Sequence, residues 1–145
     1  MGRRRLAREI VLQALYLVDT SKVPPSEAFA IVTANLEERD PKVLEFARGL
    51  LEGAAAERAD LDEKIKAHAT NWELGRMAAV DRNIIRLAAY ELLHRLDTPV
   101  SVVIDEALEI AKIFSTEDST RFINGVLDKL KDYRPADGSA SAPPA

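Results

Sequence analysis

The sequence of 145 residues contains no cysteine. Disulfide bonds, thiolate catalysis and cysteine metal sites are therefore excluded. No apolar run approaches the roughly 20 residues that a membrane-spanning helix needs. The N-terminal arginines are not followed by the apolar stretch and small-residue cleavage site of a secretory signal. We therefore expect a cytoplasmic protein that does not associate with membranes.

Glycine and histidine are also scarce, with six and two residues. The glycines are scattered and form no phosphate-binding loop. Glu91 and His94 have the Glu-x-x-His spacing of di-iron proteins, but such a site needs a second pair, and Lys64 and Ile65 stand where a glutamate partner of His68 would be. We predict no catalytic residue, no metal site and no cofactor.

Charge is distributed unevenly along the chain. Residues 1–20 hold four arginines against two acidic residues, so they carry +2 while the remainder carries −6, within a net charge of −4. Any binding of a polyanion must therefore be local to the N-terminal end. Farther along, Asp105, Glu106 and Glu109 are interpreted as a solvated acidic face with Lys112 nearby.

Apolar residues recur with helical periodicity throughout, and no stretch has a pattern that convincingly predicts a β-strand. The first helix is expected over 3–18, and the central one over 76–96. Capping signals at Ser26, Asp40-Pro41, Asp60 with Glu63, Ser101, and 115–118 predict the starts of five others. We predict an all-α fold of about seven helices, with a disordered Pro/Ala/Ser tail over 134–145.

The central stretch 76–96 has an apolar arc wider than the roughly 100° of a surface helix, so we expect neighbours on several sides. Glu91 falls inside that arc, and a buried carboxylate must be paired or hydrogen-bonded. We therefore favour a structural ion pair over a catalytic acid. Arg82, Asn83 and Arg86 are assigned to the opposite, polar side. Trp72 is expected to pack over the junction of two halves, and Gly125 to permit a close helix contact.

Arg4, Arg5, Arg8 and Tyr16 fall within about a 120° arc of the first helix, away from its apolar face. Guanidinium groups and an aromatic ring along one face are suited to a nucleic-acid strand, through phosphate contacts and base stacking. A solvated arginine face, with the tyrosine packed on a neighbouring helix, explains the same pattern. The pattern alone does not decide between them.

Four segments in register resemble the bacterial transcription antitermination factor NusB family. They are RRRLARE followed by QALY in 3–16, VDRNIIRLAAYELL in 80–93, Pro99 with IDEALEIAK in 104–112, and EDS with FINGVLD in 117–128. The resemblance implies two three-helix subdomains, roughly 1–58 and 76–133, around the central helix. It also implies binding of boxA RNA together with NusE, a small-subunit ribosomal protein, within the RNA polymerase antitermination complex on ribosomal RNA operons. Some relatives form homodimers.

The resemblance carries several residues over to an RNA site. They are the arginine-rich start (Arg3, Arg4, Arg5 and Arg8), Tyr16, and Asp118, Ser119 and Phe122 at the start of the last helix. Asp81 matches an acidic position that we assign to the NusE side. Leu6 interrupts the arginine run where some members keep a basic residue. Four phosphate contacts to single-stranded RNA predict a salt slope, the change in the logarithm of the binding constant with the logarithm of the salt concentration, of roughly −2.8.

Three other functions compete with this one. The NusB-like domain of RNA cytosine methyltransferases would need a catalytic domain that this sequence does not contain. A helical protein-interaction module would lose no RNA affinity when the arginines are replaced. A small hydrolase would need convergent carboxylates or histidines, which the sequence does not offer.

Overall fold

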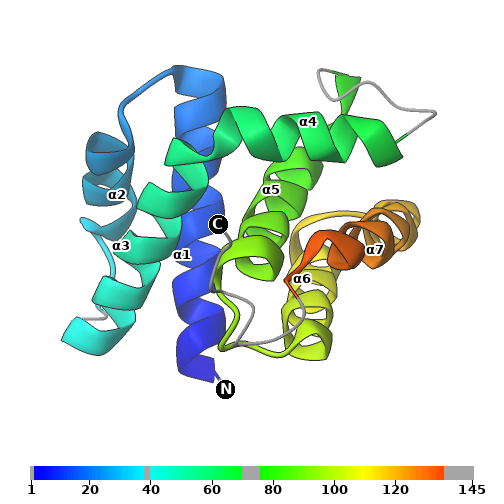
Figure 1. The fold of residues 1–145 in the computed structure, drawn as a ribbon. Coiled ribbons are helices and arrows are strands. Elements are labelled where there is room, and N and C mark those ends of the chain that lie inside the picture. Colours follow the sequence, from blue (N-terminus) through cyan, green and yellow to red (C-terminus); the bar gives the residue numbers. More distant parts are fainter. Residues whose placement is uncertain (1, 38–39, 70–75, 136–145) are drawn as a thin grey trace.

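The computed structural model describes residues 2–37, 40–69 and 76–135, and all the regular secondary structure in these ranges is helical (Figure 1). The elements are α1 (Gly2–Ser21), α2 (Pro25–Thr33), α3 (Pro41–Ala56), α4 (Arg58–His68), α5 (Ala79–His94), α6 (Val100–Phe114), α7 (Glu117–Leu130) and the short 3-10 helix η2 (Lys131–Tyr133). The expected all-α class is confirmed. Trp72 and residues 136–145 lie outside the described ranges.

Two of the expected helix starts are confirmed by side-chain caps. The carboxylate of Asp40 accepts a hydrogen bond from the backbone N–H of Lys42 at 2.9 Å, with Pro41 as the first helical residue of α3. The hydroxyl of Thr116 accepts from the N–H of Ser119 at 3.0 Å at the start of α7. Such caps satisfy N–H groups that have no partner within the helix.

The expected caps at Ser26, Asp60 and Ser101 are wrong. Helix α2 already begins at Pro25 and α6 at Val100, each after a proline in extended conformation. Proline suits a helix start because its missing N–H is not needed there. Asp60 lies inside α4, where it pairs with Lys64 at 2.8 Å instead of capping. The central helix spans 79–94 rather than 76–96, and α1 continues past residue 18 to Ser21.

The helices enclose two hydrophobic cores. One lies among α1, α2 and α3 and the other among α4, α5, α6 and α7. Each core also takes one buried residue from the other unit, because Leu12 of α1 joins the second and Leu87 of α5 joins the first, and the partly buried Tyr90 of α5 packs against both. Helix α4, which lies between the predicted subdomains 1–58 and 76–133, packs with the second unit, because Leu61 and Ile65 are fully buried in the second core.

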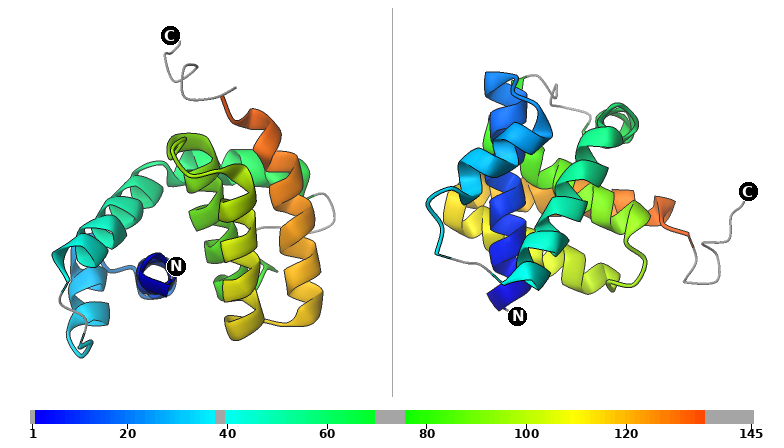
Figure 2. Two further views of the ribbon diagram at one scale, coloured as in Figure 1. Left: turned by 90° about the horizontal axis from the view of Figure 1, so that it is seen from below. Right: turned by 90° about the vertical axis from the view of Figure 1, so that its left-hand side faces the viewer.

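Helix α1 lies between the pair α2–α3 on one side and α5–α6 on the other, as the view along its axis shows (Figure 2). Helix α4 crosses near the far end of α5 from the α5–α6 connection (Figure 1). The start of α1 and the end of α5 lie at the same end of the molecule, opposite α4 (Figure 1). This placement puts the arginine-rich segment beside both α3 and the α5–α6 connection.

The close helix approach occurs at Gly53 rather than at Gly125. A Cβ at position 53 would lie 2.0 Å from the hydroxyl oxygen of Tyr90, whereas one at position 125 would meet nothing within 4 Å. The predicted role of Gly125 is therefore wrong, and α3 and α5 are the helices that need a glycine.

The folded part of the chain also includes Arg134, which the sequence analysis places in the tail. Its guanidinium donates to the backbone carbonyls of Arg95 at 2.9 Å and Thr98 at 2.5 Å.

Candidate nucleic-acid interface

The arginines at the start of α1 diverge to different neighbouring helices. Arg3 pairs with Asp40, the cap of α3, at 2.5 Å. Arg5 points to α6 and forms a two-bond ion pair with Glu106, at 2.9 and 2.8 Å. Arg4 instead lies with its guanidinium carbon 4.2 Å from the ring centroid of Phe46 in α3. The single face predicted from periodicity is therefore divided between two sides of α1.

Arg8 is buried rather than exposed. Its Nε and Nη2 atoms each donate to a carboxylate oxygen of Glu91 at 2.8 Å. The residues are only 3% and 2% exposed. The expectation that Glu91 forms a structural ion pair is confirmed. Because this pair occupies Arg8, the expectation that its side chain lies on a solvated face is wrong.

Glu106, unlike Glu91, does not lie where the sequence predicts it. Its side chain is 15% exposed, and it accepts both bonds from Arg5 instead of lying on a solvated face. The hydrogen bond and charge of Arg5 lower the pKa of Glu106, despite the opposing effect of burial. The same hydrogen bond raises the pKa of Arg5. Glu109 keeps the expected partner, Lys112, at 3.1 Å.

Tyr16 lies farther along α1 beside an apolar groove. The groove has a volume of about 430 Å³, and Tyr16 is 41% exposed at its edge. Arg5 pairs with Glu106 near the middle of α6, and Tyr16 lines the groove together with Phe114 at the end of α6, so α1 and α6 run in the same direction. Phe114 is 39% exposed. The other lining residues include Leu12, Gln13, Leu17, Ile31, Val32 and Val80.

The start of α7 is attached to α5 through Asp81. The hydroxyls of Ser115 and Ser119 donate to the two carboxylate oxygens of Asp81 at 2.5 and 2.7 Å. Asp118 is highly exposed and pairs with Arg121, while Phe122 packs partly buried on the second core. The structure thus brings Asp81 and Ser119 together, a contact that helical spacing within either segment could not reveal.

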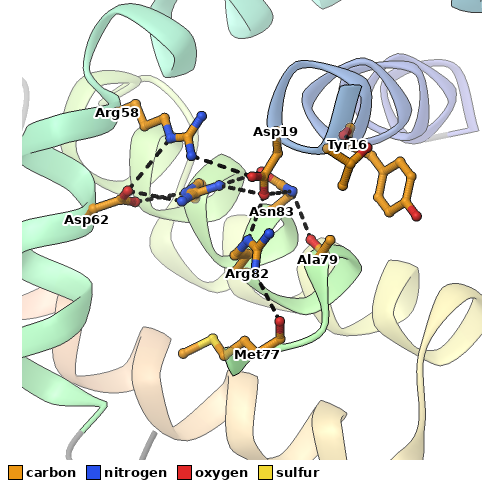
Figure 3. Close-up of polar contacts among 10 residues, drawn as sticks. Tyr16, Asp19, Arg58, Asp62, Met77, Ala79, Arg82 and Asn83 are labelled. Atoms are coloured by element: carbon orange, nitrogen blue, oxygen red, sulfur yellow. Dashed lines mark hydrogen bonds and ion pairs between the residues drawn. The ribbon is translucent and has the colours of Figure 1, made fainter. Parts of the chain in front are cut away.

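A buried polar network lies on the expected polar side of α5, and the sequence pattern does not predict it (Figure 3). Asp19 of α1 is 5% exposed. It accepts from Arg82 Nε at 2.6 Å, Asn83 Nδ2 at 2.9 Å and Arg86 Nη1 at 3.0 Å. Arg86 makes a further two-bond pair with Asp62 of α4. These contacts fix the end of α1 against α4 and α5, so Asn83 and Arg86 are buried rather than solvated.

The charges around Asp19 determine its ionisation. Burial acts to raise its pKa, but hydrogen bonds from Arg82 and Asn83, with the charges of Arg86 and Arg82, outweigh burial and hold the pKa well below its usual range. The sequence contains only part of the information needed to predict this network. The arginine and asparagine spacing on α5 marks one polar face, but nothing local indicates that Asp19 covers it.

The fold and this surface define an all-helical binding protein of two packed units, in which no described helix is long and apolar enough to cross a membrane. A model of the NusB family matches residues 5–132. The chain belongs to the NusB family.

Relatives and solved structures agree with that assignment. The transcription antitermination protein NusB of Elusimicrobium minutum is 50% identical over 135 residues, covering 92% of this chain and 96% of the relative. That of Geobacter sulfurreducens is 44% identical, covering 95% and 100%. The structure of T. maritima NusB matches with a TM-score of 0.83 at 36% identity, covering 90% of this chain and 92% of that chain. A structure of the antitermination factors NusB and NusE with dsRNA matches with a TM-score of 0.84 at 26% identity, covering 91% and 98%. The relatives from Elusimicrobium minutum and Geobacter sulfurreducens are both named transcription antitermination proteins.

Proposed function

We propose that this chain is a cytoplasmic transcription antitermination factor that binds boxA RNA together with NusE and joins the RNA polymerase antitermination complex, notably on ribosomal RNA operons. The observation that carries the proposal is the match along nearly the whole chain, in sequence and in fold, to NusB proteins, one of them solved with NusE and dsRNA.

The arginines of α1 have two roles in this proposal. Arg3, Arg4 and Arg5 are the accessible cations, and they contact RNA phosphates. RNA must compete with Asp40 and Glu106 for Arg3 and Arg5, because those carboxylates already occupy the guanidinium groups. Arg8 acts indirectly, since its ion pair with Glu91 holds α1 on α5 and so places the other three.

The start of α7 supplies the contacts that read bases. Asp118 and Ser119 offer a carboxylate and a hydroxyl, which recognise base edges, and the rings of Phe122 and Tyr16 stack on unpaired bases. Asp81 supports this segment by accepting from Ser115 and Ser119. The apolar groove beside Tyr16 offers NusE a contact surface that adjoins the RNA, and Asp81 lies next to the Val80 that lines it.

The proposal is tested by measuring binding of a short boxA-type RNA, with and without NusE, over a salt series. Contacts from Arg3, Arg4 and Arg5 alone give a salt slope of about −2.1, at about −0.7 each. We expect tighter binding with NusE and weaker binding of a scrambled RNA. A folded protein that binds neither RNA in either condition contradicts the proposal and favours a protein-interaction module.

Arg4→Gln is the sharpest variant, because no carboxylate in the described ranges lies within ion-pair distance of Arg4. It should weaken RNA binding and reduce the slope by about 0.7. Lys66→Gln is the matched control, since it removes one exposed positive charge from the last turn of α4, at the opposite end of the molecule.

A further inference from the structure

Three guanidinium groups surround the ring of Phe46. The guanidinium carbons of Arg4, Arg8 and Arg95 lie 4.2, 5.6 and 5.7 Å from the ring centroid. Arg95 directly follows α5, and it also lies 5.9 Å from the ring centroid of Tyr90. These distances are within the range of cation–π attraction. The cluster joins α1, α3 and the end of α5.

Two of these charges are not balanced by a carboxylate. Arg8 is neutralised by Glu91. In the parts of the chain that the structure describes, neither Arg4 nor Arg95 lies within ion-pair distance of an acidic side chain, whereas Arg3 and Arg5 both do. Two like charges on one ring repel each other, and an anion between them would relieve the repulsion.

The surroundings of Arg95 hold its side chain against α3. A Cβ at Gly49 would lie 2.9 Å from Nη2 of Arg95, so the absence of a side chain there leaves room for the guanidinium. Arg134 donates to the backbone carbonyl of Arg95 at 2.9 Å and so fixes the main chain at the end of α5. A depression of about 240 Å³ opens on the Arg4 side of this cluster, and Arg95 does not line it; its lining residues are Arg4, Arg8, Asp97, Thr98, Pro99, Val102 and Glu106.

We propose that Arg95, together with Arg4 on the ring of Phe46, binds RNA phosphate groups and extends the RNA surface from α1 across α3 to the end of α5. This rests on the proposed function. Stacking uses the face of a guanidinium and leaves its N–H groups available, in a geometry that suits phosphate oxygens. Because phosphates carry no sequence information, the patch strengthens binding of every RNA and does not select boxA.

The test compares Arg95→Gln with wild type, using boxA-type and scrambled RNA over a salt series. Arg95 raises the wild-type slope from about −2.1 to about −2.8, and Arg95→Gln should return it to about −2.1. We expect about fivefold weaker binding of both RNAs at low salt, as for loss of one charged contact. Lys66→Gln, the distant control, should change neither quantity.

Arg95→Lys separates charge from folding effects. It keeps the positive charge, so it should retain most of the salt slope even where the glutamine variant is less stable. Thermal unfolding of each variant shows whether it is folded at the assay temperature. Gly49→Ala keeps every charge but displaces the guanidinium, and it should weaken RNA binding without lowering the helicity of the protein.

The outcomes distinguish this inference from the proposed function. If wild type binds RNA with NusE and Arg95→Gln binds equally well with the same slope, only the role of Arg95 is wrong. If Arg95→Gln loses NusE but keeps RNA, the patch is a protein contact and the inference is also wrong. If wild type binds no RNA, both fail together.

Discussion

The guanidinium of Arg8 and the carboxylate of Glu91 join α1 to α5 by two hydrogen bonds of 2.8 Å, at a site where both residues are almost completely buried. Burying two charges is costly, and their attraction offsets that cost only while both are present. The pair therefore makes the position of α1 depend on one carboxylate in the central helix.

Glu91→Gln should lower the free energy of unfolding by about 3–5 kcal/mol, because it leaves the buried Arg8 without its counter-charge. Urea unfolding followed by circular dichroism measures this loss. A double variant, Arg8→Met with Glu91→Leu, should recover most of the stability, since no charge then remains buried. A double variant no more stable than Glu91→Gln would show that the pair is not a self-contained unit.

Stability should depend on pH through Asp19. Its folded pKa lies below the unfolded value of about 3.9, so its contribution is complete above that value and is lost as pH falls through the folded pKa. We expect Asp19→Asn to be several kcal/mol less stable than wild type at neutral pH, since it leaves Arg82 and Arg86 without this carboxylate. The difference should shrink as pH is lowered below about 4. Unfolding curves at several pH values check this, and a difference constant with pH would contradict it.

Gly53→Ala should destabilise the protein by about 1–3 kcal/mol, because the added methyl group collides with the ring of Tyr90. Gly125→Ala is the matched control. Its Cβ meets no neighbour, so alanine should stabilise the helix by up to about 1 kcal/mol. The two thermal midpoints should move in opposite directions. Equal shifts would mean that Tyr90 relaxes without cost.

Thr116→Ala should cost about 1 kcal/mol, because Thr116 caps α7 through the N–H of Ser119. Ser26→Ala and Ser101→Ala should change stability by less than about 0.5 kcal/mol, since neither hydroxyl caps its helix. Chemical denaturation of the three variants under one condition makes the comparison. A loss at Ser26 or Ser101 as large as that at Thr116 would contradict the observed helix starts.

Helical periodicity predicted the fold class, the central helix and the burial of Glu91, because these depend on spacing within one helix. It could not reveal which side chain crosses to which helix. Arg5 and Glu106 are 101 positions apart, and Asp19 meets residues more than 60 positions away. Periodicity therefore gave the correct angular positions of Arg4, Arg5 and Arg8 around the axis of α1. Because α1 lies between two groups of helices, however, these side chains contact different neighbours.

The exchange of Leu12 and Leu87 between the two cores has a consequence for cooperativity. Each core is completed by a residue from the other unit, so neither can open without exposing apolar surface in its neighbour. The two units should unfold in one transition, reported alike by probes in α3 and α7. Damage far from the arginine-rich end, such as the loss of a buried side chain in α7, would then reduce the population of molecules able to bind at all.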